Sequence, residues 1–348
     1  MIVAAAPAYA TRHANPYNAL LADALAGAGA EVREFAVGDL VGARPDIVHV
    51  HWPELLFLST HRPWQARARI ATFARLLRRA RARGTRLVWT VHNDGAHEER
   101  STPGARAALD RMLARHVDAV FSLSAAGDDA ARARLGPEVP VFRTRHGDYA
   151  GAYPFRDDRA GARAELGVDA HARLVVAVGQ VRPYKNLERL IEVARASDDP
   201  DLRVVVAGAP DGPATADALE RAAAGDPRIR LDLGYLDDEE VAAWLAAADL
   251  VALPYRRILN SGAALLALTA HRPVLVPALG AMPELAADLG PSWVRAYAGE
   301  LDAGVLAAAV DWAAAERATG PDLSAYRWAT IADETLAGYR LTLARPPR

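Results

Sequence analysis

The chain has 348 residues, of which 51% are hydrophobic and 24% charged, and it contains no cysteine. This length exceeds one ordinary domain and fits two. The net charge of -2 at pH 7 excludes a general nucleic-acid binder, because no positive field would attract a phosphate backbone. Disulfides and thiolate chemistry are excluded as well. No apolar run approaches the roughly 18 residues of a spanning helix, so we expect a cytoplasmic protein.

Short apolar runs alternate with helical patterns through the first half of the chain. Such alternation is typical of a parallel sheet with right-handed helical crossovers. The predicted strands are Ile2–Ala6, Glu31–Phe35, Ile47–His51, Arg86–Val91 and Ala119–Leu123. The predicted helices lie near 18–28, 65–83, 102–115 and 125–135.

A second set of the same kind follows. Its predicted strands are Leu174–Val178, Arg203–Ala207, Ile229–Leu233, Leu250–Leu253 and Val274–Val276. Its predicted helices lie near 186–196, 213–224, 238–247 and 262–270. Between the two sets, residues 145–161 are rich in Gly, Pro, Asp and Tyr without periodicity and indicate a linker. After about residue 296 the pattern is helical only.

These patterns predict an α/β protein made of two doubly wound, Rossmann-like domains that face each other across a cleft. We expect the first domain over 1–150, the second over 151–325, and a C-terminal helix over 326–348 that packs back on the first domain. In such sheets ligands bind outside the carboxyl ends of the strands. Candidate site residues should therefore follow the strands directly.

The stretch "GQVRPYKNLERLIEVA" (179–194) places two cations where a strand gives way to a helix. Gly179 allows the chain to turn, and Arg182 and Lys185 follow it. A helix start carries unpaired N–H groups and a partial positive charge, so added cations are unfavourable there unless an anion binds between them. The alternative is two solvated cations on a loop.

A second candidate anion site lies in "PYRRILNSGAALLALTAHRPVLV" (254–276). Here Asn260, Ser261 and Gly262 open an apolar helix, and Asn or Ser is a natural N-cap. The amides of such a helix start bind phosphate. A plain N-cap explains the segment equally well when it is taken alone. Together with Arg182 and Lys185 it predicts a clamp for a diphosphate.

Histidines and carboxylates gather at strand ends in the first half. "DIVHVHWPE" places His49 and His51 on one face of a strand with Glu54 beyond it, and one of these histidines is expected to be a buried, hydrogen-bonded one. "TVHNDGAHEE" places His92, Asp94, His97 and Glu98 after the next strand. The spacing matches no compact metal-ligand motif, so we expect no metal. His92, Asp94 and Glu98 are placed for substrate binding or acid–base work.

Two further segments of the first half are notable. "RHANPYNALLADAL" (12–25) follows the first strand, and it either forms a plain loop and helix start or offers Asn15 and Tyr17 to a sugar on the cleft rim. No G-x-G-x-x-G occurs there, which argues against a dehydrogenase. Residues 65–86 contain eight arginines and no acid. This basic helix either packs its apolar stripe on a sheet and solvates its charges, or contacts anionic lipid on the inner face of the membrane.

The sequence resembles glycosyltransferases of the two-domain GT-B fold, specifically family 4, over nearly the whole chain. The resemblance rests on "GQVRPYKNLERLI", "LVALPYRRILNSGAALLAL", "RPVLVPALGAMPEL", "DIVHVHWPE" and "NPYNALLADAL". It implies transfer of a sugar from a nucleotide-sugar donor, held mainly by the second domain, to an acceptor held mainly by the first. It also implies that no cofactor or bound metal takes part. The acceptor stays open: a glycan, a glycolipid or a small glycoside.

The resemblance also implies roles for particular residues. Those implied in catalysis are His92, Arg182 and Lys185. Those implied in donor binding are Gly179, Arg182, Lys185, Asn260, Ser261, Gly262 and Glu284. Those expected on the acceptor side are Asn15, Tyr17, His51, Glu54, Asp94 and Glu98.

Two departures from the family pattern stand out. Where relatives carry an arginine after the glycine, this chain has Gln180, and Arg182 resembles a substitute. Where many relatives carry two glutamates with seven residues between them, this chain has Ile258 and Leu266, so recognition of the sugar and ribose must differ.

The departures leave the stereochemistry and the reaction class open. With retention, the leaving phosphate takes the acceptor's proton and His92 orients the donor, and this is the outcome we expect. With inversion, a carboxylate base is needed near the acceptor, and the candidates are Asp94, Glu98 and Glu54. A nucleotide-sugar epimerase and a non-catalytic nucleotide-sugar binder remain alternatives.

Overall fold

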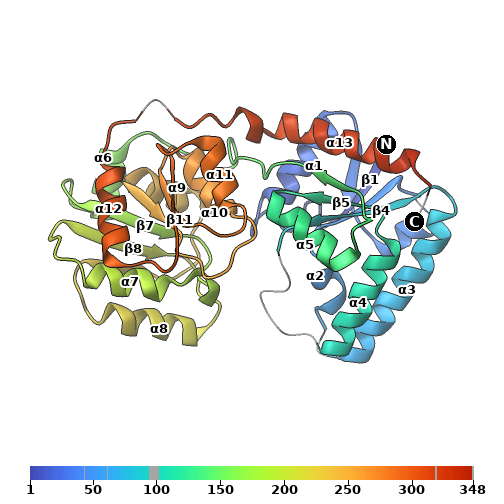
Figure 1. Cartoon of the computed structure of the whole chain (residues 1–348), viewed down its shortest axis with the longest axis horizontal. Coiled ribbons are helices and arrows are strands. Elements are labelled where there is room, and N and C mark those ends of the chain that lie inside the picture. Colours follow the sequence, from blue (N-terminus) through green and yellow to red (C-terminus); the bar gives the residue numbers. More distant parts are fainter. Residues whose placement is uncertain (43, 61, 94–101, 318–319, 347–348) are drawn as a thin grey trace. The chain divides into compact units, whose positions relative to one another are not determined.

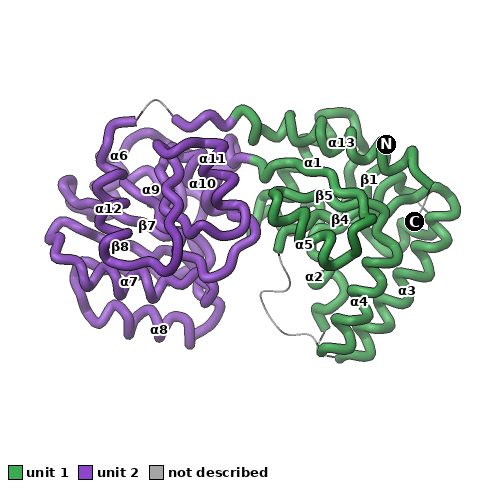
Figure 2. The backbone as a smooth tube through the Cα atoms, viewed as in Figure 1, with its two compact units in different colours: residues 1–147, 324–348 green, residues 148–323 purple. Residues whose placement is uncertain are grey.

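The computed structural model describes residues 1–42, 44–60, 62–93, 102–317 and 320–346. It divides into two compact units: unit 1 comprises residues 1–147 and 324–348, and unit 2 comprises residues 148–323 (Figure 2). Each unit holds one six-stranded sheet, in which every strand pairing is parallel. The prediction of two doubly wound α/β domains is confirmed. The sequence placed the boundaries at 150/151 and 325/326.

The sheet of unit 1 has the strand order β2-β1-β3-β4-β5-β6. Its inner strands are buried along their length because helices cover both faces (Figure 1). The strands are β1 (Ile2–Ala6), β2 (Glu31–Glu34), β3 (Ile47–Val50), β4 (Arg86–Val91), β5 (Ala119–Ser122) and β6 (Val141–Arg143). The helices are α1 (Tyr17–Gly27), α2 (Pro53–Leu58), α3 (Pro63–Arg81), α4 (Pro103–His116), α5 (Ala125–Leu135) and α13 (Trp328–Ala344), with 3-10 turns η1 (Val37–Leu40) and η3 (Ser324–Tyr326).

The C-terminal helix α13 belongs to unit 1, as the sequence predicted. It lies beside α1 (Figure 1). Its buried residues Ile331, Leu336 and Tyr339 share one core cluster with Val3 and Val88 of the sheet. The helix therefore completes the core of a unit whose other strands and helices lie some two hundred residues earlier in the chain.

The sheet of unit 2 has the order β12-β11-β10-β7-β8-β9. The chain runs outward from β7 to β9 and then returns to β10, which is the strand order of nucleotide-binding doubly wound folds. The strands are β7 (Arg173–Val178), β8 (Leu202–Ala207), β9 (Ile229–Asp232), β10 (Leu250–Ala252), β11 (Val274–Pro277) and β12 (Val294–Tyr297). The helices are α6 (Arg159–Leu166), α7 (Leu187–Arg195), α8 (Pro213–Ala223), α9 (Asp238–Ala247), α10 (Gly262–Thr269), α11 (Met282–Leu289) and α12 (Ala303–Ala313), with the 3-10 turn η2 (Pro183–Lys185).

Local sequence explains most of these elements. Runs such as Leu174–Val178 are rich in β-branched valine and buried, and α9 begins with a capping box formed by Asp237 and Glu240. The predicted linker is shorter than expected, because Asp158 accepts a hydrogen bond from the Gly161 amide (2.8 Å) and starts α6 inside it. Among the described residues, no helix is both long and apolar enough to cross a membrane.

Candidate active site

The topology of unit 2 brings the two predicted anion-binding segments to one place. β7 and β10 are neighbours in the sheet, with Val176 opposite Val251, and the chain leaves them in opposite directions along the sheet. The carboxyl ends of two such strands enclose a crevice that binds ligands. One predicted segment follows β7 and the other follows β10.

The turn after β7 depends on two glycines. Gly179 has φ 102°, a left-handed conformation that favours glycine, and its N–H donates to the Ala207 carbonyl at 2.9 Å. Gly208, after β8, lies directly against this turn. A Cβ atom on Gly208 would stand 2.2 Å from the Gly179 carbonyl oxygen. Only glycine therefore fits at 208.

Lys185 stands over this turn. Its Nζ is 3.9 Å from the place of a Cβ atom on Gly179. Burial and, to a smaller extent, the nearby Arg182 guanidinium together lower the pKa of Lys185 to about 8. In the described part of the chain no carboxylate pairs with Lys185. A partly buried cation without a counter-charge is costly, and a bound anion would relieve that cost.

Arg182 is placed differently. Its guanidinium donates to the Val181 carbonyl at 3.0 Å and to Gln180 Oε1 at 3.1 Å, and its side chain is partly exposed. Gln180 occupies the position where relatives carry an arginine. Its side-chain oxygen accepts a hydrogen bond from Arg182, the residue that resembles a substitute for that arginine. Lys185 is partly exposed as well, so the two cations differ in their partners: the protein binds the guanidinium of Arg182, whereas no described carboxylate pairs with Lys185.

The segment after β10 is tied directly to this turn. The Arg256 N–H donates to the Tyr184 carbonyl at 2.9 Å, and the Tyr184 and Tyr255 rings lie 6.0 Å apart. Ser261 caps α10 by accepting from the Ala264 N–H at 3.1 Å. The structure therefore brings the two anion-binding segments together, as the sequence predicted.

The remaining predicted donor residues border the same segment. Asn260 precedes the cap and Gly262 is the first residue of α10. Gly280 has φ 54° and packs so closely that a Cβ atom there would lie 2.2 Å from the Ile258 carbonyl oxygen. This contact holds the start of α11, with Glu284 in its first turn, beside the loop that leads to Ser261.

In unit 1, histidines follow the carboxyl ends of two strands. His51 follows β3 and His92 follows β4, and His51 Nδ1 lies 3.1 Å from His92 Nε2. The Trp52 ring stacks on His92 with centroids 4.4 Å apart. His49 is bonded on both ring nitrogens, to the Tyr339 hydroxyl at 2.6 Å and to Thr90 Oγ1 at 2.7 Å. His49 is thus the buried strand histidine that the sequence led us to expect.

Burial keeps this histidine cluster uncharged. It lowers the pKa of His51 to about 3 and that of His146 to about 4. It also lowers the pKa of His92, and the neighbouring His51 and His146 add to that shift. Neutral imidazoles can donate one hydrogen bond and accept another. The cluster therefore suits uncharged hydroxyl groups and is a poor general base at neutral pH.

Two residues predicted on the acceptor side make contacts within unit 1. Tyr17, predicted on the cleft rim, is 2% exposed because it begins α1 and its ring packs 4.9 Å from His92 and 4.7 Å from His146. Glu54 was a candidate base, but it pairs with Arg134 at 2.8 Å and with Arg106 at 3.4 Å. Glu54 therefore ties α2 to α4 and α5.

The other acceptor-side predictions have different outcomes. Asn15 accepts from the Tyr17 N–H at 3.1 Å and so shapes the start of α1. Asp94 and Glu98 lie outside the described residues. Among the described residues no group of three or more His, Asp or Glu side chains is arranged to hold a metal ion.

Sequence reasoning missed three members of the unit 1 cluster. His146 lies in the segment that we interpreted as linker, and it follows β6, a strand of only three residues. Trp52 directly follows His51 and was quoted without a role. Trp328 begins α13 and packs on Tyr17 at 5.3 Å and against Gly147, where a Cβ atom would lie 2.2 Å from the indole.

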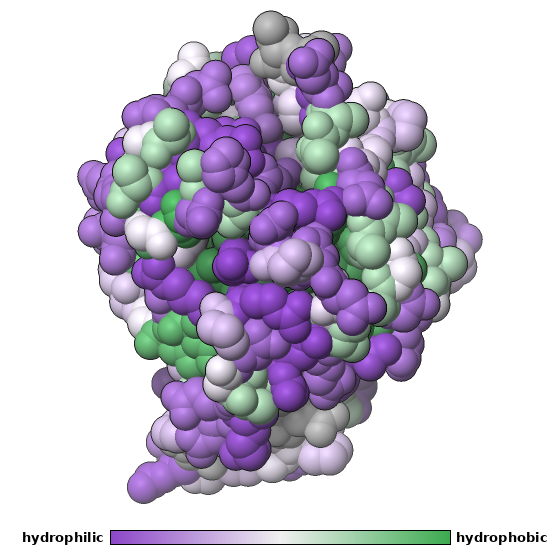
Figure 3. Space-filling model, turned by 90° about the vertical axis from the view of Figure 1, so that its left-hand side faces the viewer, coloured by the Kyte–Doolittle hydropathy of each residue, from purple (hydrophilic) through white to green (hydrophobic). Residues whose placement is uncertain are grey.

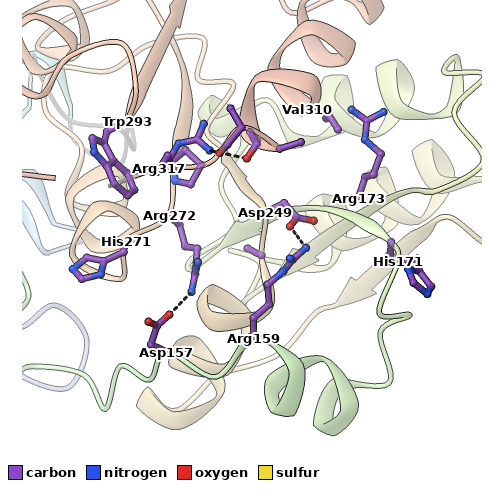
Figure 4. A pocket seen from close by; sticks show the side chains of 16 residues that line it. Asp157, Arg159, His171, Arg173, Asp249, His271, Arg272, Trp293, Val310 and Arg317 are labelled. Atoms are coloured by element: carbon purple, nitrogen blue, oxygen red, sulfur yellow. Dashed lines mark hydrogen bonds and ion pairs between the residues drawn. The ribbon is translucent and has the colours of Figure 1, made fainter. Parts of the chain in front are cut away.

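A cavity of about 540 Å³ opens in unit 2 at the opposite, amino edge of the sheet (Figure 4). Its arginines are engaged by the protein itself. Arg317 donates to the carbonyls of Trp312 and Ala313 at the end of α12, Arg272 donates to Leu245 at 2.8 Å, and Arg159 pairs with Asp249. Because these cations neutralise helix C-termini and a carboxylate, we interpret the cavity as structural.

Comparisons with known proteins agree with this geometry. Residues 172–315 match the family model described as glycosyl transferases group 1. GDP-mannose:glycolipid 4-beta-D-mannosyltransferase of Xanthomonas campestris pv. campestris is 35% identical over 323 residues, which cover 91% of this chain and 85% of that protein. D-inositol 3-phosphate glycosyltransferase of Mycobacterium tuberculosis is 28% identical, over 85% of this chain and 61% of that protein.

Solved structures share the fold over the whole chain. Sucrose-phosphate synthase from Thermosynechococcus elongatus has a TM-score of 0.72 at 17% identity, covering 99% of both chains. HepE of Anabaena, solved with UDP-glucose, has a TM-score of 0.65 at 17% identity, covering 98% of this chain and 95% of that one. The fold is that of the GT-B glycosyltransferases.

This chain belongs to the group 1 glycosyl transferases of the GT-B fold and is a hexosyltransferase that uses a nucleotide sugar.

Proposed function

We propose that the protein transfers a mannosyl group from GDP-mannose to a hydroxyl group of a glycolipid acceptor. The observation that supports this most is the 35% identity, over 91% of the chain, to a GDP-mannose:glycolipid 4-beta-D-mannosyltransferase. Lys185 at the switch point of unit 2, which pairs with no described carboxylate, supports the donor half of the proposal, because a nucleoside diphosphate supplies the anion that this cation lacks.

In this proposal the donor diphosphate binds between Lys185, Arg182 and the N-terminus of α10. Negative charge grows on the leaving phosphate as the glycosidic bond breaks, so a fixed cation and the amides behind Ser261 stabilise the transition state. This is the charge that a divalent metal supplies elsewhere. We therefore propose that turnover needs no added metal ion.

We further propose that the sugar's configuration is inverted, in place of the retention that the sequence suggested. The mannosyl group of GDP-mannose is α-linked to phosphate, and the relative's name gives a β-linked product, which requires one displacement at the anomeric carbon. Inversion needs a base for the acceptor hydroxyl. Since Glu54 is bound by two arginines, the carboxylates that the sequence offers for this role are Asp94 and Glu98.

The neutral histidine cluster has a positioning role in this scheme. His92 is held by His51 on one side and by the Trp52 ring on the other, so its orientation is fixed before a ligand arrives. We propose that it binds a sugar hydroxyl group. Holding one hydroxyl in a fixed direction lowers the entropy cost of reaching the reactive geometry.

A nucleotide-sugar panel tests the donor. GDP-mannose should raise the unfolding temperature more than UDP-glucose, dTDP-glucose or ADP-glucose, because a ligand that binds the folded state stabilises it. In a glycolipid assay, GDP release should continue in the presence of EDTA, and the product should be cleaved by a β-mannosidase. Stabilisation by a different nucleotide sugar would overturn the donor assignment, and cleavage only by an α-mannosidase would overturn inversion.

A further inference from the structure

The exposed face of α3 is the largest concentration of unpaired charge in the described chain. From residue 63 to residue 86 the sequence contains no acidic residue. Five arginines of α3 are solvent-exposed, and we call them the α3 basic face. They are Arg67, Arg69, Arg75, Arg78 and Arg79.

None of these five side chains makes an ion pair or a hydrogen bond with another described residue. Many surface arginines of unit 2 differ from these five because a carboxylate pairs with them, as at Arg156, Arg159, Arg173, Arg189, Arg228 and Arg230. Others, such as Arg195 and Arg221, have no ion pair with a described residue and lie on different helices. One face of the molecule is mostly hydrophilic, with smaller hydrophobic patches (Figure 3). The bare charge of α3 is therefore a local feature of a chain whose net charge is -2.

A buried histidine beside this face reports the resulting field. Burial, together with the positive charges of Arg81, Arg115 and Arg78, lowers the pKa of His116 to about 4. Arg81 is neutralised by Asp118 at 2.7 Å, whereas Arg78 and Arg115 are exposed on adjoining helices α3 and α4. Positive charge thus extends from α3 onto α4.

Exposed apolar side chains occur on α3 itself and on two segments that pack against it. Trp64, in the first turn of α3, is 64% exposed, and Leu55 of α2 is 63% exposed. Val37 and Val41, at the two ends of η1, are exposed as well. Both neighbouring segments pack on α3: the Phe57 ring of α2 lies 5.0 Å from Phe73, and η1 contacts the helix.

The structure also corrects how this helix could meet a lipid surface. Its apolar stripe, formed by Ile70, Phe73 and Leu77, is buried in unit 1 with at most 5% exposure. The helix therefore cannot turn that stripe into a bilayer without unfolding the unit. What remains available is the opposite face, with its arginines and with Trp64 at one end.

We propose that the α3 basic face, together with Trp64 and Leu55, docks unit 1 on a bilayer that contains anionic phospholipids. The arginines bind the lipid phosphates, each adding a roughly equal and salt-sensitive increment. The indole of Trp64 enters the interfacial layer, where an amphipathic ring is most stable. Exposed aliphatic residues beside arginines favour a lipid surface over a nucleic acid, which would leave these residues in water. The inference does not rest on the donor or the acceptor proposed above.

Flotation of the full chain with vesicles tests the proposal. The protein should float with vesicles of phosphatidylcholine and phosphatidylglycerol at low salt, and should float far less at high salt or with pure phosphatidylcholine. The double variant Arg75→Glu, Arg78→Glu should bind about tenfold more weakly or worse. Trp64→Ala should bind roughly threefold more weakly while the salt dependence stays as in the wild type.

The matched control reverses the same number of charges in unit 2. Arg195 and Arg221 are exposed on α7 and α8, and Arg195→Glu, Arg221→Glu should float like the wild type. Thermal unfolding and the donor-induced shift should be unchanged in every variant, which shows that folding and donor binding are intact. Three results would overturn the proposal. The two double variants could bind the vesicles equally well, or the wild type could bind pure phosphatidylcholine as strongly as anionic vesicles. In the third case, the wild type would bind an acidic protein or RNA but would not float with anionic vesicles.

Discussion

The two units place opposite electrostatics at the carboxyl ends of strands in different parts of their sheets: β7 and β10 flank the point where the strand order of unit 2 reverses, whereas β3 and β4 lie to one side of that point in unit 1. At the carboxyl ends of β7 and β10, Lys185 is a partly buried cation that pairs with no described carboxylate. At the carboxyl ends of β3 and β4, His51 and His92 are buried in the neutral form. A cation without a carboxylate partner favours binding of an anion. Histidines that burial keeps uncharged favour binding of sugar hydroxyl groups. The common fold therefore supplies the strand ends, and the side chains supply the ligand class.

The largest expected effect comes from removing the Lys185 cation. Lys185→Met keeps most of the length of the side chain and deletes its charge, so in the proposed reaction the growing charge on the leaving phosphate loses a counter-ion. We expect kcat/KM to fall about tenfold to a hundredfold, since a charge-assisted contact contributes about 1.5–3 kcal/mol. Arg195→Met, an exposed cation of the adjoining α7, is the control and should retain the wild-type rate. Equal rates in the two variants would remove Lys185 from the site.

The next effect concerns the turn that carries Lys185. Gly208→Ala places a Cβ atom 2.2 Å from the Gly179 carbonyl oxygen at φ 145°, so it should lower the free energy of unfolding by about 2 kcal/mol or more. Gly212→Ala is the matched control, because nothing lies within 4 Å of its added carbon. Urea denaturation measures both. If Gly208→Ala left the free energy of unfolding unchanged, the turns after β7 and β8 would not be in contact.

A smaller effect is expected at the other cation. Arg182 is held by Gln180 Oε1 and is partly exposed, so solvent and salt screen its attraction for phosphate. Arg182→Ala should lower kcat/KM by roughly two- to fivefold, and the deficit should shrink as ionic strength rises. A loss as large as that of Lys185→Met, unaffected by salt, would contradict the unequal roles of the two cations.

The smallest effect is expected in unit 1. Because the pKa values of His51 and His146 lie at about 3 and 4, these groups are already neutral at the pH where an ordinary histidine titrates. The kcat profile should therefore be flat from about pH 5.5 to pH 7.5. An arm with an apparent pKa near 6.5 that disappears in His92→Gln would contradict a neutral His92.

Much of this architecture follows from local sequence, and the exceptions have physical reasons. Strands with four or more consecutive apolar residues, such as Leu174–Val178, were predicted to within a residue. β6 was missed because Val141–Arg143 is only three residues long and partly exposed. α6 was missed because its first residues lie in the segment that we predicted as linker. The start of α6 is marked by a single capping hydrogen bond to Asp158.

The site shows the same division between local and long-range information. The two donor-side segments could be paired from sequence because β7 and β10 are each marked by a strand end and a turn. The role of Glu54 could not be predicted from sequence, since its partners Arg106 and Arg134 lie 52 and 80 residues further along the chain, on other helices. The burial of Tyr17 likewise depends on His146 and Trp328, which come from the far end of unit 1.

One titration tests the central claim that Lys185 is a cation without a counter-charge in the described part of the chain and that it binds the donor diphosphate. The affinity for GDP should be measured calorimetrically between about pH 7 and pH 10 in the wild type and in Lys185→Met. Because the free pKa is about 8 and a bound anion raises it, wild-type binding should weaken as pH rises above 8, with proton uptake on binding. The variant should bind weakly and should lack this additional pH dependence. Any titration of GDP itself affects both proteins equally, so the difference between the two curves reports Lys185 alone. Identical affinity and pH dependence in the two proteins would contradict the account.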